Sequence, residues 1–434
     1  MIGPRRMLSV VTLLGVAACR DRPSELATYQ SKVAEAVPKI EAAIGLPFAT
    51  APVVEVRTKD DVRKFLERQL TDSLARAQVS GQEAALKRLG LIPDTISLER
   101  LLLDVLEEQI GGYYDPRAKV LYIVEGTPEE AVGLTVSHEL IHALQDQHLN
   151  LDSVMRATGD DDRTAAAQAV LEGQATYEGL RIMVGAEMAD NLPGGWDRAR
   201  EMIRDNHAKW PAFASAPLVV QEMLLFPYLS GAEFARAYRA SKPGQSPYGA
   251  MPTSTEQILH PSRFLGEIDH PTRVVLPPLA GVTTLYDNTV GEFTTRLFLY
   301  EHLRDQQSAL SGGAGWDGDR LTVVKTGRGE GAVWVSAWDT QIDAADFFTL
   351  IERTIDRRYG PSPARTLSRT EAGAGMASGK EYTVGGRTVS VRTGEISGRP
   401  VVVYVDLPAG DNSTVLDVAR IRLEDPSIAL PDGG

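Results

Sequence analysis

The sequence predicts an α+β fold made of two unequal globular parts. Its 434 residues are enough for two or three domains and a large apolar core. Up to about residue 305, apolar residues recur mostly at helical spacing, with a short strand and one hairpin near the start. Beyond residue 318 the pattern changes to β-branched strands around a helix. We therefore expect a small sheet-bearing lobe and a helical lobe first, followed by a smaller α+β domain.

Residues 1–18 are expected to be a secretory signal peptide. Two arginines precede an apolar run that is too short to span a bilayer, and small residues lead up to Cys19. The string VAAC that ends at Cys19 resembles the lipobox of bacterial lipoproteins, which implies cleavage before Cys19 and acylation of this residue. A plain signal peptide followed by a chance cysteine is the alternative. Residues 19–50 would then form a tether and a helix at 24–44.

The net charge bears on the partners that the protein can bind, and the cysteine content bears on what can stabilise its fold. The formal net charge is -13 at pH 7, and loss of residues 1–18, which carry two arginines and no acid, makes the mature chain more negative still. Such a chain is not expected to bind nucleic acid. Because Cys19 is the only cysteine, no intramolecular disulfide can form, and the fold must rest on its core and on any bound metal.

The first globular domain is expected to cover residues 51–305. Its hairpin is indicated by two short runs rich in aromatic and β-branched residues on either side of Asp115-Pro116-Arg117. The later part of the domain, from residue 195, is mostly helical but interrupted by prolines. The elements expected before residue 195 are a strand at 53–56, helices at 59–74 and 98–108, the hairpin at 111–126, and helices at 128–148 and 163–184.

The second domain is expected at 319–434, after a linker at 306–318. The linker is indicated by the glycine-rich string SGGAGWDG at 311–318. The elements expected in the second domain are strands at 321–325 and 332–337, a helix at 344–357, strands at 387–392 and 400–405, and a final helix near 415–421. This domain carries no residue pattern that indicates catalysis.

The helix expected at 128–148 has a recognisable start. Thr127 is expected as its N-cap, Pro128 at the first helical position and Glu130 at N3, which together form a capping box. The helix therefore begins well before the string HELIH at 138–142, which matches the HExxH motif.

The HExxH string predicts a zinc site. At about 100° per residue, His138, Glu139 and His142 share one arc of the helix, while apolar residues occupy the opposite arc. Imidazoles at i and i+4 can both bind one Zn²⁺. Glu139 lies beside such a metal without binding it, which makes it the expected general base. A solvated amphipathic helix that matches by chance is the alternative.

A third protein ligand has three candidates. His148 stands where the HExxHxxGxxH pattern of metzincins has its last histidine, but Gln145 replaces the glycine that lets the chain leave the helix. In a continued helix His148 points about 120° away from His142. Glu172, on the next expected helix, is flanked by alanines and a glycine that allow close helix packing, whereas Glu178 has fewer small neighbours. We favour Glu172.

The stretch from Gly112 to Glu178 resembles the gluzincin type of zinc metallopeptidase domain, and in particular that of uncharacterised bacterial lipoproteins. The strings that carry the resemblance are YYDPRAKVLYIV, SHELIHALQDQH and LEGQAT, together with TSTEQILHP at 253–261 and WDGDRLTVV at 316–324. The resemblance implies a zincin-like catalytic domain. It implies Zn²⁺ on His138, His142 and Glu172 with Glu139 as base, and it implies no particular substrate.

Two departures from better-known gluzincins are plain. Thermolysin-like enzymes carry an aspartate four residues after the glutamate ligand, where this chain has Thr176, so support for His138 must come from elsewhere. The GxMEN motif of zinc aminopeptidases is also missing, because Gly249-Ala250-Met251 is followed by Pro252.

The resemblance also suggests how a peptide would be held. In zincins the strand before the active-site helix lies at the sheet edge above the metal, where an extended peptide can add as a further strand. Tyr113, Tyr114 and Tyr122 would then be strand residues of this hairpin. For the oxyanion of the transition state we expect a histidine or tyrosine donor from the helical lobe, with His260 as first choice and Tyr228 as second.

Together these features lead us to expect a zinc peptidase that is lipid-anchored on the periplasmic or outer face of a bacterial envelope, with a peptide or protein as substrate. The alternative is a non-catalytic envelope lipoprotein of the same fold that acts as a binding or assembly module. Retention of Glu139 argues against that alternative, because a binding module has no need of a base.

Overall fold

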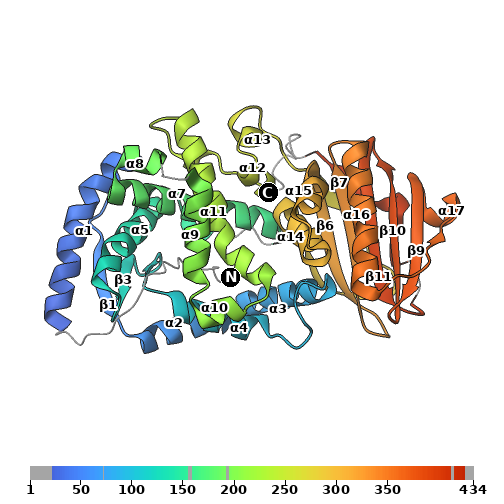
Figure 1. Ribbon diagram of the computed structural model, residues 1–434, viewed down its shortest axis with the longest axis horizontal. Coiled ribbons are helices and arrows are strands. Elements are labelled where there is room, and N and C mark those ends of the chain that lie inside the picture. The colour runs from blue at the N-terminus through green and yellow to red at the C-terminus, as the bar shows by residue number, and fades with distance from the viewer. Residues whose placement is uncertain (1–21, 72, 155–158, 192–194, 412–414, 426–434) are drawn as a thin grey trace, which may run out of the picture.

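The computed structural model describes residues 22–71, 73–154, 159–191, 195–411 and 415–425. The chain is an α+β protein, as the sequence predicts. Figure 1 shows a mainly helical part with a three-stranded sheet at one end, and a seven-stranded sheet with a helix in front of it at the other. Cys19 and the expected signal peptide lie outside the described residues, so lipid anchoring stays a prediction.

The small sheet lies between helices of the N-terminal part. These elements are α1 (Arg22–Ile44), β1 (Val53–Arg57), α2 (Lys59–Thr71), α3 (Ser73–Arg88), α4 (Leu98–Gln109), β2 (Gly112–Asp115) and β3 (Val120–Val124). The strand order is β1-β3-β2, with β1 parallel to β3 and β2 antiparallel to it through the expected hairpin. The hairpin turn is held by Asp115, whose Oδ1 accepts hydrogen bonds from the backbone N–H groups of Arg117 and Ala118. β2 is therefore an edge strand, whereas β3, the strand directly before the HExxH helix, is central and does not lie at the edge where the strand before the helix was expected.

Helix α5 (Glu129–His148) follows the hairpin and packs against β2 and β3. The expected capping box does not form: Pro128 is the N-cap, and the Thr127 hydroxyl donates to the carbonyl oxygens of Gly111 and Val124. Thr127 thus ties the start of the helix to the hairpin. Most residues of α5 up to Gln145 are buried, so the helix is surrounded by protein instead of having one solvated face.

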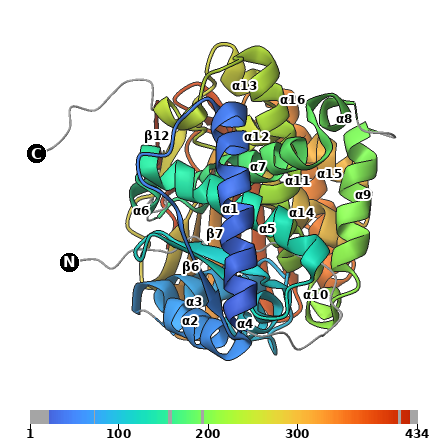
Figure 2. The same cartoon turned by 90° about the vertical axis from the view of Figure 1, so that its left-hand side faces the viewer.

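Helix α1 covers one side of α5. Figure 2 shows α1 in front of α5 and α7 (Asp161–Val184), and α1 contacts both. Tyr29, Val33, Ile40 and Ile44 of α1 recur at helical spacing and enter a core with apolar residues of α5. The expected helix of the N-terminal tether is therefore part of the globular body.

Helices α7 and α11 (Leu218–Ser241) touch backbone to backbone. A Cβ on Gly173 would overlap the backbone of Gly231, and a Cβ on Gly231 would overlap the carbonyl oxygen of Ala169. The small residues around Glu172 were expected to allow close packing on α5. Gly173 instead serves the contact with α11, whereas Ala175 lies in the core shared with α5.

Short helices and loops fill the rest of the helical part, consistent with its many prolines. They are α6 (Leu151–Val154), α8 (Ala186–Asp190), α9 (Gly195–His207), α10 (Pro211–Ser215), η1 (Pro247–Gly249), α12 (Thr255–Leu259), α13 (Ser262–Leu265) and α14 (Gly291–Leu303).

The C-terminal part is built on an antiparallel sheet with the order β5-β6-β7-β11-β10-β9-β8. Its strands are β5 (Thr283–Asn288), β6 (Trp316–Lys325), β7 (Glu330–Trp338), β8 (Arg365–Thr366), β9 (Met376–Val384), β10 (Arg387–Ile396) and β11 (Arg399–Pro408). The accompanying elements are α15 (Gln306–Gly313), α16 (Gln341–Tyr359), α17 (Arg369–Ala372), the turn η3 (Val418–Arg420) in place of the expected final helix, and the paired strands β4 (Arg273–Val275) and β12 (Arg422–Glu424).

The expected linker at 306–318 is instead helix α15 and the beginning of β6. Asp305 caps α15 by accepting hydrogen bonds from the N–H groups of the first turn. The glycines of this segment allow close packing, because a Cβ on Gly312 would overlap the side chain of Leu350 and one on Gly313 that of Arg296. Since β5 precedes this segment and pairs with β6, the C-terminal sheet begins at residue 283.

Both faces of this sheet are buried, and the alternation of side chains along each strand assigns them to two cores. On β7, Trp334 and Trp338 enter the larger core with α14 and α16, while Val333 and Val335 enter a second core with loop residues and η3. The larger core also includes residues of α3 and α4 and so connects the two parts of the molecule.

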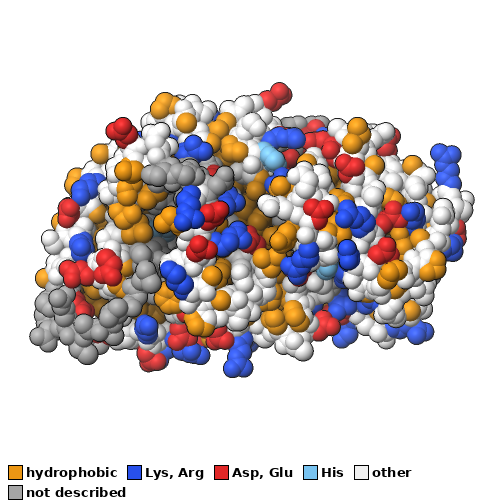
Figure 3. All heavy atoms as spheres, viewed as in Figure 1, with side chains coloured by type: hydrophobic (Ala, Val, Ile, Leu, Met, Phe, Trp, Pro, Cys, Tyr) orange, Lys and Arg blue, Asp and Glu red, His pale blue; other side chains and the backbone are white. Residues whose placement is uncertain are grey.

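Hydropathy and surface charge complete the description. In the described part of the chain, no helix combines the length and the apolar character that a membrane span requires. On the face seen in Figure 3, basic and acidic side chains are interspersed.

Candidate metal centre

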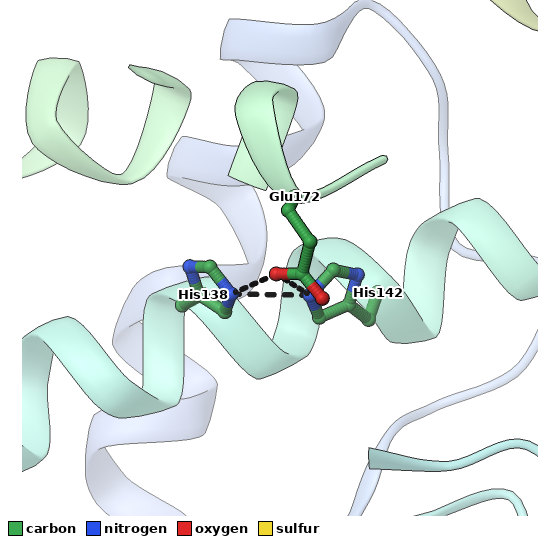
Figure 4. Close-up of side chains that lie close together, drawn as sticks. All are labelled: His138, His142 and Glu172. Carbon is green, nitrogen blue, oxygen red and sulfur yellow. Dashed lines mark hydrogen bonds and ion pairs between the residues drawn. The ribbon is translucent and has the colours of Figure 1, made fainter. Parts of the chain in front are cut away.

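Three buried side chains from α5 and α7 meet at one point (Figure 4). His138 and His142 lie one turn apart on α5, and their Nε2 atoms are 3.1 Å from each other. Glu172 reaches across from α7 and places Oε2 at 3.1 Å from His138 Nε2 and 3.3 Å from His142 Nε2. All three residues are at most 3% exposed.

This arrangement fits a zinc ion. Zinc binds histidine nitrogen and carboxylate oxygen at about 2.0 to 2.1 Å in tetrahedral geometry, which places neighbouring ligand atoms about 3.3 Å apart. The separations between Nε2 of His138, Nε2 of His142 and Oε2 of Glu172 are 3.1 to 3.3 Å. Three protein ligands leave a fourth tetrahedral position for water or substrate, as in catalytic zinc sites.

Gln145 fixes the tautomer of His142. The side-chain amide nitrogen of Gln145 donates to the backbone carbonyl of Leu171 and to Oε1 of Gln174, each at 3.0 Å. Because a carbonyl oxygen only accepts, the amide orientation is set, and Gln145 Oε1 must face Nδ1 of His142, 2.8 Å away. In its neutral form His142 therefore carries its proton on Nδ1 and directs the Nε2 lone pair at the centre.

Sequence reasoning missed this role of Gln145. It treated the residue only as a departure from the metzincin glycine. The network continues from Gln174 to the hydroxyl of Tyr248, which donates to Gln174 Oε1 at 2.6 Å. The available signal was the spacing, because a side chain three residues after His142 lies on the same side of a helix.

Glu139 is completely buried beside the two histidines. Its Oε2 accepts a hydrogen bond of 2.8 Å from the backbone N–H of Tyr114 on β2. Its Oε1 is buried and has no hydrogen-bond partner among the described residues. Burial raises the pKa of Glu139 to about 8, although His142 opposes this shift. One oxygen is thus held by the edge strand and the other remains available.

Electrostatics at the centre favour a positive charge between the three converging side chains. Burial lowers the pKa of His138. For His142 burial also acts to lower the pKa, but the carboxylate of Glu172 outweighs it and raises the pKa to about 9. Burial acts to raise the pKa of Glu172, but His142 and His138 outweigh it and lower the pKa to about 2. Glu172 is therefore an ionised carboxylate.

The hairpin is braced against the far half of α5 by Asp146. The Tyr114 hydroxyl donates to Asp146 Oδ2 at 2.9 Å, and Lys119 forms an ion pair with the same oxygen at 2.5 Å. The Asp146 side chain is only 4% exposed, whereas that of Lys119 is 61% exposed, so the buried carboxylate is reached by one cation from the solvent side. This brace fixes the position of β2, and with it the backbone N–H that holds Glu139.

The two candidate oxyanion donors lie in different surroundings. The ring of Tyr228 on α11 stacks near His138, with ring centroids 6.1 Å apart and an interplanar angle of 27°. His260 instead pairs with Glu292 of α14 at 3.1 Å and contacts Arg296. Tyr228, the second choice from sequence, is therefore the candidate beside the centre, and His260 belongs to another charged cluster.

Neither alternative third ligand joins the centre. His148 lies at the exposed end of α5, where its Nε2 donates to the carbonyl oxygen of Pro47 at 2.8 Å. Glu178 is engaged by Arg239 at 2.8 Å and by Arg181 at 3.0 Å. Of the three candidates, Glu172 is the one that the structure brings to the two histidines.

Comparison with known proteins adds one partial similarity. A family model described as a domain of unknown function, DUF8575, matches residues 281–399. This stretch begins two residues before β5 and ends at the first residue of β11, so it covers much of the C-terminal sheet and none of the candidate metal centre. The comparison with curated proteins and the comparison with solved structures each gave no match.

Proposed function

We propose that this chain is a zinc-dependent peptidase of the gluzincin type with a zincin-like catalytic domain. The observation that carries the proposal is the convergence of Nε2 of His138, Nε2 of His142 and Oε2 of Glu172 at separations of 3.1 to 3.3 Å. Two imidazoles and one carboxylate are a ligand set of catalytic zinc sites that retain an open position.

Glu139 would serve as the base. A zinc ion held by the three ligands would supply a Lewis acid that lowers the pKa of water and polarises a carbonyl group. In the ionised form of Glu139, the unpartnered Oε1 is the oxygen that can accept a proton from a water molecule and pass it to the leaving amine. The hydrogen bond from Tyr114 to Oε2 keeps the carboxylate in place during both transfers.

The edge strand supports a peptide as the substrate. β2 pairs with β3 on one side only, and Tyr114 of β2 touches the base directly. An extended peptide that adds to a sheet edge gains backbone hydrogen bonds whatever its sequence. Its scissile bond would then lie beside α5. Tyr228, next to His138, is the proposed donor to the developing oxyanion.

The decisive variant is Glu139→Gln, which keeps the size of the side chain and removes the basic oxygen. General base catalysis typically contributes about 10²- to 10⁴-fold, so cleavage of a broad peptide library should fall by at least that range. Zinc content, measured by elemental analysis, should stay at about one equivalent. Equal cleavage by the zinc-loaded variant, or no cleavage by the zinc-loaded parent, would contradict the proposal and favour a binding module.

A paired experiment tests the ligand set. Glu172→Ala removes a ligand and should lower zinc affinity by more than the 10- to 100-fold that loss of an outer partner typically costs. His148→Ala removes a histidine of similar donor chemistry at the exposed end of the same helix and should leave zinc binding unchanged. The reverse pattern would favour the metzincin-like arrangement.

We also propose that the protein is lipid-anchored in a bacterial envelope through Cys19. The support is the sequence before Cys19, since this segment lies outside the described residues. Cys19→Ser should release the protein from the membrane fraction and remove the mass of the acyl groups. A serine variant that stays in the membrane with unchanged mass would contradict the anchor.

A further inference from the structure

A cavity of about 320 Å³ lies among α3, α4, α7, α11 and α14. Most of its wall is apolar, and the apolar side chains that line it include Leu86, Leu89, Leu98, Met223, Leu224 and Phe293. A dry cavity of about 150 Å³ already accommodates a benzene ring, so this one has room for an aromatic or long aliphatic group.

One wall of the cavity is the part of α7 that precedes Glu172. Asp161, Ala165 and Gln168 line the cavity, and they precede Glu172 by eleven, seven and four residues. At about 100° per residue, these positions lie within about 40° of Glu172 around the helix. Gln168 is about 6 Å from Glu172 along the helix axis. The face of α7 that carries Glu172 therefore continues as a wall of the cavity.

Helix α11 makes the same connection from the opposite side. Leu224 and Pro227 line the cavity, and Tyr228 follows Pro227 directly. Leu224 lies one turn before Tyr228, whose ring stacks near His138. On each of the two helices, a residue that lines the cavity thus lies about one turn from a residue at the candidate centre.

We propose that this cavity binds an aromatic or long aliphatic side chain of the peptide whose scissile bond lies at the candidate zinc centre. The inference rests on the proposed peptidase function and specifies its substrate class. The substrate would carry this side chain next to the scissile bond, because the cavity begins about one helical turn from Glu172.

The charges of the wall favour an apolar occupant. Among the lining residues the formally charged ones are Asp161 and Asp162, and no lysine, arginine or glutamate contributes. Asp162 accepts hydrogen bonds from the backbone N–H and the hydroxyl of Thr255. Asp161 accepts from Gln78 at 2.8 Å and from the Tyr286 hydroxyl. A charged side chain would lose its water here without an unengaged partner, whereas an apolar one gains from burial.

The test is Ala165→Phe, which adds a ring on the cavity side of α7 without changing any proposed ligand. The matched control is Ala34→Phe, which adds the same ring at an exposed position of α1. Zinc-loaded full-length proteins are compared on peptide pairs that carry phenylalanine or alanine beside the scissile bond. A second readout, independent of catalysis, is the fluorescence of the apolar probe N-phenyl-1-naphthylamine bound to the zinc-free proteins.

The parent and Ala34→Phe should cleave the phenylalanine peptide about 10- to 100-fold more efficiently, as kcat/KM, than the alanine peptide. Ala165→Phe should lose this preference and should bind the probe at least about 10-fold more weakly than the control. Cleavage without a preference, or a preference that survives Ala165→Phe, would overturn the inference and leave the peptidase function standing.

Two further outcomes are distinguishable from these. A preference for lysine or arginine that disappears in Asp161→Asn would overturn the apolar assignment in favour of a basic side chain. No cleavage of any peptide by the zinc-loaded parent would overturn the proposed function, and the substrate assignment with it.

Discussion

Gln145 offers a direct test of how the candidate centre is held. Its Oε1 accepts from His142 Nδ1 at 2.8 Å, and its amide nitrogen donates to Leu171 O and Gln174 Oε1. Gln145→Leu keeps the bulk of the side chain and removes all three hydrogen bonds. His142 would lose the partner that fixes its tautomer, while the carbonyl of Leu171 would lose a buried donor.

The size of the effect follows from these contacts. Loss of an outer partner of a ligating histidine typically weakens metal binding about 10- to 100-fold, which is about 1.4 to 2.8 kcal/mol. The zinc-free protein should also be less stable, because a buried group left without its partner costs about 1 to 3 kcal/mol. Gln145→Glu separates the two effects: it can still accept from His142 but cannot donate to Leu171 or Gln174. It should lose stability and retain zinc better than Gln145→Leu.

The assay is a zinc titration against a competing chelator, paired with thermal unfolding of the zinc-free protein. Gln147→Leu is the matched control. Gln147 lies two residues further along α5 and bonds the loop at Ala49 and Thr50, so its loss should leave zinc affinity unchanged. If Gln145→Leu bound zinc as tightly as the parent, His142 would not depend on this partner and the reasoning would be refuted.

Three further expectations concern stability. Gly231→Ala should lower the free energy of unfolding by about 3 kcal/mol, the upper end for overpacking, because the added Cβ would overlap the α7 backbone. Gly133 has open space around it, so Gly133→Ala should raise the free energy of unfolding by about 0.5 to 1 kcal/mol in the same denaturant titration. Glu178→Ala should cost about 1 to 3 kcal/mol through lost bonds to two arginines, yet keep full zinc content; loss of zinc would make it a ligand. Burial, assisted by Arg358, lowers the pKa of His302 to about 4 from 6.5. As the pH drops, the imidazole of His302 is therefore protonated in the unfolded chain before it is protonated in the folded one. The free energy of unfolding should fall by up to about 3 kcal/mol between pH 6.5 and pH 4. His302→Gln should reduce that pH dependence, and an unchanged slope would contradict the assignment.

Local patterns predicted the elements that carry the centre. Helical periodicity gave the helix with His138 and His142 to within one residue at its start, and the helix with Glu172 to within two. Alternation and the turn residues gave the β2–β3 hairpin. These signals lie within a few residues of each other along the chain, which is why one sequence sufficed.

What the sequence could not supply depends on contacts between distant segments. The glycines at 312 and 313 read as a linker because nothing nearby shows that Leu350 and Arg296 pack against them. Thr127 has the residue type of an N-cap, but carbonyl groups of the hairpin compete for its hydroxyl. His260 was preferred over Tyr228 without knowledge of Glu292, its buried partner on a helix 32 residues later.

The core that joins the two halves makes the candidate metal centre depend on the C-terminal sheet. Phe298 of α14 meets Trp334 of β7 edge to face, with ring centroids 5.6 Å apart, in a cluster that extends from α3 to β11. Deleting or nicking the C-terminal sheet would strip one wall from this cluster and expose it to water, so both halves should melt together. Cleavage of the C-terminal sheet should therefore also unfold the candidate metal centre, although the three converging side chains of that centre lie on α5 and α7.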